Sequence, residues 1–90
     1  MMAVRFSGAF TKDLKRIAKR GYDCQRLEAI VDALRQGTPL PPATRPHPLR
    51  GEWKGYWECH VAPDWLLIYK VSEDEVLVAR TGTHSDLFKL

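Results

Sequence analysis

The 90-residue chain is small and basic, and its composition narrows the class of protein. It has 14 Lys and Arg residues against 11 Asp and Glu residues, a formal net charge of +3, and 44% hydrophobic residues. A chain of this length forms one domain, here spanning residues 1–90. Its hydrophobic content is enough for a core without a metal or disulfide, and together with the 28% of charged residues it excludes a disordered chain.

The two cysteines and the distribution of apolar residues predict where the protein works. Cys24 and Cys59 match no zinc or redox motif. No hydrophobic leader stands at the start of the chain, and no apolar run approaches the ~20 residues that span a bilayer. We therefore expect a cytoplasmic protein with two free thiols and no membrane partner.

The first part of the chain predicts a strand followed by two helices. Residues 4–6 indicate a short strand, and Ser7 can cap the next helix because its hydroxyl accepts an unpaired backbone N–H. Apolar residues recur at helical spacing from residue 10 to residue 18, with basic residues off this face. A second apolar stripe lies between Asp23, which can cap a helix, and Gly37, which can end it.

A proline-rich segment follows the second predicted helix. Five prolines lie between residues 38 and 50, and this stretch also contains His47. Proline fixes its own backbone angle and has no N–H to donate, so this density excludes a helix or a central strand. We expect a stiff, extended loop that presents His47.

The second half of the chain predicts three strands. Residues 56–61 alternate with period two, which places His60 on the same strand face as Glu58. Residues 65–71 are almost continuously apolar and indicate a central strand, and residues 75–80 indicate the last strand, before a short terminal turn. The order β-α-α-β-β-β predicts an α+β fold in which a helical hairpin packs on an antiparallel sheet.

All three histidines lie in this second half, and each has neighbours that could bind a phosphodiester or help to cleave it. His60 precedes Asp64 by four residues, and Arg80 precedes His84 by four residues, while His47 lies in the proline-rich loop. Imidazole has an unperturbed pKa of ~6.5, so it gives and takes protons near neutrality. Several imidazoles with an arginine in a basic protein predict metal-free cleavage of RNA.

Four blocks of the sequence together resemble the YafQ branch of the RelE/ParE toxin superfamily. They are FTKDLKR (residues 10–16), HPLRGEW (47–53), ECHVAPDWLLIY (58–69) and RTGTHSDLF (80–88). The resemblance implies a small RelE-like fold without a cofactor. It also implies a toxin of a type II toxin–antitoxin system that cleaves translated mRNA on the ribosome and is inhibited by a cognate antitoxin. The toxin alone is expected to be a monomer that joins a larger complex with its antitoxin.

The resemblance carries the functional positions of the family onto seven residues of this chain. They are His47, His60, Asp64, Trp65, Arg80, His84 and Phe88. Trp65 and Phe88 are expected to bind substrate by stacking on bases, and the other five are expected to be catalytic.

In RNA cleavage the 2′-hydroxyl is the nucleophile, so the protein needs a base, an acid and a positive charge. We predict that His84 is the general acid and that His60 or His47 is the base. Asp64 would orient or charge an imidazole, and Arg80 would neutralise the charge that develops on the phosphorane oxygens. Whether these groups reach one cleft depends on strand register, which the sequence does not specify.

Basic residues gather on the first predicted helix. Lys12, Lys15, Arg16 and Lys19 lie off its apolar stripe. Across residues 1–20, these four together with Arg5 and Arg20 stand against a single acidic residue, Asp13. This asymmetry favours an anionic partner, either a nucleic acid or an acidic protein. We expect Lys15, Arg16 and Lys19 to contact RNA phosphates and to receive an acidic antitoxin segment.

Two other classes of protein compete with this interpretation. A non-enzymatic ParE-like toxin would bind DNA gyrase, but it would not need three imidazoles. A zinc enzyme could use three histidines and Asp64 as ligands, but the chain has no His-x-His or His-Glu-x-x-His spacing. We therefore expect no metal site.

Overall fold

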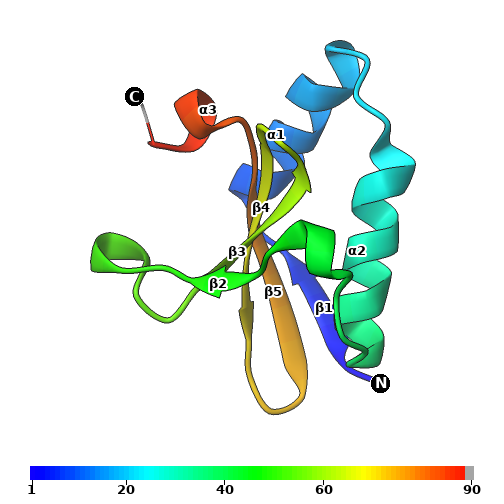
Figure 1. The fold of residues 1–90 in the computed structure, drawn as a ribbon, viewed down its shortest axis with the longest axis vertical. Coiled ribbons are helices and arrows are strands. Elements are labelled where there is room, and N and C mark those ends of the chain that lie inside the picture. The colour runs from blue at the N-terminus through cyan, green and yellow to red at the C-terminus, as the bar shows by residue number, and fades with distance from the viewer. Residues whose placement is uncertain (89–90) are drawn as a thin grey trace.

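A five-stranded mixed sheet carries two long helices on one face in the computed structural model, which describes residues 1–88 (Figure 1). In chain order, the helices and strands are β1 (Ala3–Phe6), α1 (Gly8–Lys19), α2 (Cys24–Gln36), β2 (His47–Pro48), β3 (Trp57–Ala62), β4 (Trp65–Val71), β5 (Glu75–Gly82) and α3 (His84–Phe88). Short 3-10 turns, η1 (Pro42–Thr44) and η2 (Gly51–Trp53), flank β2. Within the described part of the chain, no helix is long and apolar enough to cross a membrane.

The strand order in the sheet is β1-β5-β4-β3-β2. The last four strands pair antiparallel, which confirms the predicted meander, and His47–Pro48 adds a two-residue edge strand from within the proline-rich segment. Proline is tolerated there because an edge strand has a side without ladder partners. The sheet is mixed rather than wholly antiparallel, because β1 pairs in parallel with β5. This pairing joins the two strands that are furthest apart in the sequence, so local patterns carry no signal for it.

The predicted helix caps form as expected. Ser7 Oγ accepts the N–H of Phe10 at 2.9 Å and donates to the carbonyl oxygen of Ala79 at 2.6 Å, which ties the start of α1 to β5. Asp23 accepts the N–H of Gln25 at 3.0 Å at the start of α2. Gly37 ends that helix with φ of 72°, a conformation that favours glycine.

The sheet buries side chains on both of its faces. On the helical face, Ile17 and Leu27 pack with Leu67 and Val78 in the main core. On the opposite face a smaller cluster forms around Leu66, Ile68, Ala79 and Leu87, and Leu49, Trp53, Tyr56 and Phe88 pack against it. Residues 65–69 of β4 are all buried, which explains why the sequence there is continuously apolar rather than alternating.

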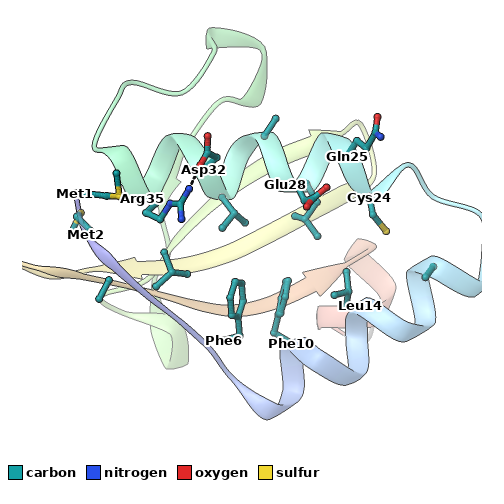
Figure 2. Close-up of a pocket in the computed structure, with 16 residues that line it drawn as sticks. Met1, Met2, Phe6, Phe10, Leu14, Cys24, Gln25, Glu28, Asp32 and Arg35 are labelled. Carbon is teal, nitrogen blue, oxygen red and sulfur yellow. Dashed lines mark hydrogen bonds and ion pairs between the residues drawn. The ribbon is translucent and has the colours of Figure 1, made fainter.

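A groove with a volume of about 1250 Å³ lies between β1, α1 and α2. Figure 2 shows the side chains that line it. Apolar side chains such as Phe6, Phe10 and Leu14 line it, with Glu28 and Asp32 of α2 also present. None of the predicted catalytic residues is among the residues that line this groove. The candidate site therefore lies elsewhere on the sheet.

Candidate active site

Strand register brings predicted catalytic residues onto one face of the sheet. His47 of β2 lies opposite Glu58 of β3, Glu58 lies opposite Ile68 of β4, and Ile68 lies opposite Arg80 of β5. Residues directly opposed across a ladder project from the same face of a sheet. His47, Glu58 and Arg80 therefore belong to one cross-strand row. His60 is two residues beyond Glu58 on the same strand, so it projects from that face as well.

The three imidazoles form a line with His60 in the middle. The ring centroid of His60 lies 6.3 Å from that of His47 and 6.1 Å from that of His84. These residues come from β3, β2 and the start of α3, so the fold gathers segments that are up to 37 positions apart in the sequence. A line of this kind places a potential base and a potential acid next to each other.

Asp64 binds His84 at two points from the turn between β3 and β4. Its Oδ1 accepts the backbone N–H of His84 at 3.0 Å and lies 2.5 Å from the ring Nδ1. The bond from the backbone N–H, and next the bond to the imidazole, lower the pKa of Asp64 from its ordinary value. Because a carboxylate only accepts hydrogen bonds, Nδ1 carries the proton in this contact. Nε2 is then the ring atom left to exchange a proton with a substrate.

His47 lies between two hydrogen-bond acceptors. Its Nε2 is 2.9 Å from Oε2 of Glu58, and its Nδ1 is 3.1 Å from the carbonyl oxygen of Arg45. Each ring nitrogen of His47 therefore faces an acceptor oxygen, to which it can bind only as a donor. Glu58 is only 6% exposed, and it was not among the residues predicted for the site. The sequence did contain a signal for Glu58 as a site residue, because the period-two pattern puts it on the same strand face as His60.

His60 is half-buried, and its ring environment differs from that of the two outer histidines. Its Nδ1 is enclosed and has no hydrogen-bond partner among residues 1–88. A buried polar atom without a partner is unfavourable, and such atoms often mark catalytic or binding positions. Both ring nitrogens of His47 face acceptors and Asp64 holds Nδ1 of His84, whereas the enclosed Nδ1 of His60 has no such partner.

Arg80 is held by a buried carboxylate of α1. Its Nε donates to Oδ2 of Asp13 at 2.6 Å, and its Nη2 donates to Oδ1 at 3.1 Å. These bonds raise the pKa of Arg80 and keep it a cation. Asp13 was not among the residues predicted for the site. A signal for it existed, since Asp13 falls at helical spacing between Phe10 and Ile17, on the buried face of α1.

Asp86 fixes the short helix that carries His84. It accepts two bonds from Arg20, the residue that caps the C-terminus of α1, at 2.7 and 3.0 Å, and one from the N–H of Thr83 at 2.9 Å. Thr83 Oγ1 in turn accepts the N–H of Asp86 at 3.1 Å, which is a capping box at the start of α3. The bonds from Arg20, and then those from Thr83, lower the pKa of Asp86 well below its usual range.

The two aromatic residues expected to stack on bases have different environments. Trp65 is only 4% exposed, its Nε1 donates to Thr81 Oγ1 at 2.9 Å, and its ring meets Tyr22 edge-on with centroids 5.0 Å apart. This position in the core contradicts the prediction that Trp65 stacks on a base. Phe88 is half-buried against the smaller cluster, so part of its ring lies at the surface and base stacking stays a prediction.

The basic residues of α1 are exposed, as the helical pattern predicted. Lys15, Arg16 and Lys19 all lie at the surface. Arg16 also approaches two carboxylates, with its Nη1 3.5 Å from Asp13 and 3.9 Å from Asp86. The α1 helix therefore presents a basic surface to solvent. On the side that faces β5 and α3, its Asp13 binds Arg80 and its Arg16 approaches Asp86 of α3.

The model of one family matches residues 2–89 of the chain, and its description is that of a bacterial toxin of a type II toxin–antitoxin system, YafQ. The chain belongs to the YafQ family. It is 44% identical over 86 residues to the mRNA interferase toxin YafQ of Escherichia coli K12, and the match covers 94% of each chain. These findings confirm the family resemblance drawn from the sequence blocks.

Solved structures of YafQ toxins share this fold. YafQ from Escherichia coli BL21(DE3) is 42% identical, with a TM-score of 0.93 over 98% of this chain and 99% of that chain. YafQ in the Escherichia coli DinJ–YafQ complex has a TM-score of 0.90 at 42% identity, over 98% and 99% of the two chains. A metal-bound toxin from Helicobacter pylori has a TM-score of 0.91 at 40% identity, over 98% and 100%. In the part of our YafQ-family chain that the structure describes, no three His, Cys, Asp or Glu residues are grouped to hold a metal ion.

Proposed function

We propose that this YafQ-family toxin is an mRNA interferase that cleaves translated mRNA on the ribosome by acid–base catalysis without a metal. The observation that carries the proposal is the line of three imidazoles, with His60 flanked by His47 and His84 at ring distances of 6.3 and 6.1 Å. The relative named mRNA interferase in Escherichia coli supports the reaction class, since 44% identity extends over 94% of both chains.

His60 is the general base in this proposal. Its ring takes the proton of the 2′-hydroxyl, and the resulting oxygen attacks the adjacent phosphorus in line. His84 protonates the departing 5′ oxygen through Nε2, because Asp64 holds its Nδ1. The products are a 2′,3′-cyclic phosphate and a 5′-hydroxyl. Each well-placed acid or base contributes about 10²–10⁴ in rate.

Two groups stabilise the charge that develops on the phosphate oxygens. Arg80 presents guanidinium donors to the phosphorane, and a fixed cation acts there without reorganising during the reaction. The second group is His47, which lies in the same cross-strand row between Glu58 and the carbonyl of Arg45. This assignment separates His47 from His60, which the sequence left as equal candidates for the base.

In this proposal mRNA, ribosomal RNA and the antitoxin bind to surfaces around the line of imidazoles. Phe88 stacks on a base near the cleaved bond, and such stacking is worth ~1–3 kcal/mol per base in single-stranded complexes. Lys15, Arg16 and Lys19 contact phosphates of ribosomal RNA. A cognate antitoxin with acidic segments covers the same basic surface, in a complex larger than the monomeric toxin. The complex of Escherichia coli YafQ with DinJ supports this kind of partner.

The decisive experiment is cleavage of an mRNA on programmed ribosomes by purified toxin. His84→Ala should lower the cleavage rate by at least about 10²-fold, because it removes the proton donor. The matched control is Ser85→Ala, which changes the next, exposed residue of α3 and should cleave normally. Thermal unfolding of each variant shows whether the fold is intact.

Further conditions of the same assay test the remaining parts of the proposal. A chelator selective for transition metals, with Mg²⁺ kept constant for the ribosome, should not change the rate, and free mRNA should not be cut. The 3′ product should carry a cyclic phosphate. Normal cleavage by a folded His84→Ala variant would contradict the catalytic assignment, whereas inhibition by the chelator would contradict metal-free chemistry.

A further inference from the structure

We propose that Asp13 of α1 is a positioning residue for Arg80 and orients its guanidinium toward the scissile phosphate. This inference rests on the proposed function, in which Arg80 stabilises the phosphorane. Asp13 is 2% exposed, although carboxylates are rarely buried in a core unless they are paired. It lies 67 residues before Arg80 in the sequence, so the contact joins α1 to the end of β5.

Four hydrogen bonds reach the Asp13 carboxylate: two from Arg80, one from the backbone of Thr81 and a longer one from Arg16. Arg80 Nε and Nη2 donate at 2.6 and 3.1 Å, and the backbone N–H of Thr81 donates to Oδ2 at 3.2 Å. The bond from Thr81 is important, because it ties the carboxylate to the backbone of β5 next to Arg80 itself. The backbone of β5 therefore fixes the Asp13 carboxylate, and the carboxylate in turn fixes the guanidinium of Arg80.

The direction of the contact leaves the other edge of Arg80 open to a ligand. A guanidinium has five N–H donors, and Asp13 engages it side-on through Nε and one hydrogen of Nη2. No residue among 1–88 accepts a hydrogen bond from Nη1. The edge formed by Nη1 and Nη2 is the fork that binds two oxygens of one phosphate. The side chain of Arg80 is 25% exposed, so part of it is accessible to a substrate.

The charge of the group stays positive although Asp13 is negative. Arg16 places its Nη1 3.5 Å from Oδ1 of Asp13, so two guanidinium groups share one carboxylate. With two positive charges and one negative charge, the group keeps a net charge of +1. Asp13 thus orients Arg80 without cancelling the charge that a phosphate would meet.

The expected loss follows from the length of the arginine side chain. Without the side-on contact, several rotatable bonds allow the guanidinium to leave the position that faces the phosphate. Displacement of a catalytic group by about 1 Å can cost about 10²-fold in rate. Asp13→Asn keeps the shape of the side chain but replaces one acceptor by an NH₂ group, so it cannot accept both bonds from Arg80. We expect kcat on programmed ribosomes to fall by about 10²-fold, with little change in KM.

The test is a double-mutant cycle between Asp13→Asn and Arg80→Ala, with thermal unfolding measured for every variant. If Asp13 acts through Arg80, Asp13→Asn should cause no further loss of kcat in the Arg80→Ala background. The pH profile of Asp13→Asn should keep its shape, because the imidazoles are unchanged. Asp74→Asn, an exposed carboxylate in the β4–β5 turn, is the matched control and should cleave normally.

The outcomes separate this inference from the proposed function. If folded Arg80→Ala cleaves normally, Arg80 does not stabilise the phosphorane, and both ideas are overturned. If Arg80→Ala is impaired but folded Asp13→Asn is not, the positioning role alone is wrong. A further loss in the Arg80→Ala background would likewise overturn that role, since Asp13 would then act through the fold or another group.

A measurement on the unmodified protein keeps the inference testable if Asp13→Asn does not fold. The Nε–H proton of Arg80 should exchange with solvent much more slowly by NMR than that of Arg50, which is exposed. Equal exchange rates would show that Asp13 does not hold the guanidinium and would overturn the proposal.

Discussion

Replacing Trp65 by Phe should weaken the fold without changing the chemistry of the folded toxin. The substitution removes the hydrogen bond from the indole Nε1 to Thr81 Oγ1, which is 2.9 Å long and buried. The net loss for such a bond is ~1 kcal/mol. The missing ring atoms leave a cavity in a site that is 4% exposed, which adds about 1–2 kcal/mol. The total, about 2–3 kcal/mol, corresponds to a fall in Tm of roughly 10–20 °C for a domain of this size.

Circular dichroism measures the thermal transition, and mRNA cleavage is assayed well below the transition of the variant. The matched control is Trp57→Phe, since Trp57 is 40% exposed and its replacement should change stability by less than about 0.5 kcal/mol. Folded Trp65→Phe should cleave at nearly the normal rate. An unchanged Tm together with a large loss of cleavage would refute the reasoning, because it would mean that the Trp65 ring contacts RNA.

Three further predictions concern charge and pH. Changing Lys15, Arg16 and Lys19 to Gln together should weaken ribosome binding and flatten its salt dependence, without moving the cleavage position in the mRNA; normal binding at moderate salt would contradict this. The cleavage rate should follow a bell-shaped pH profile with both limbs between about pH 5 and 8, and a rate that rises steadily through pH 9 would exclude an imidazole base. The bonds from Arg20 lower the pKa of Asp86, so their stabilising effect is present above the unfolded value of ~3.9 and is lost as the pH falls below it. Asp86→Asn should therefore lower Tm at pH 7 and make the acid-induced fall in Tm shallower; a fall as steep as in the unmodified protein would show that other carboxylates cause it.

The sequence by itself was enough to predict every element whose signal is local. Helical spacing and the caps Ser7 and Asp23 marked α1 and α2, because hydrogen bonds within a few residues determine where a helix begins. The nearly continuous apolar run of residues 65–71 indicated a central strand, and period two placed His60 beside Glu58 on one face. The sequence blocks predicted the YafQ family, which the comparison confirmed.

The tertiary structure decided what depends on contacts between distant segments. Register across four strands set the row of His47, Glu58 and Arg80, and a slip of one residue would have turned these side chains to the other face. Pairing of β1 with β5 made the sheet mixed.

Burial separated residues that look alike in a sequence. An aromatic residue suits either a core or a base-stacking surface, and only packing against Tyr22 and Thr81 placed Trp65 in the core. A lone acidic residue on a basic helix resembles a solvated charge, yet Asp13 is buried because a guanidinium 67 residues away supplies its hydrogen bonds. Such bonds form only when the chain is folded, so no local pattern in the sequence records them.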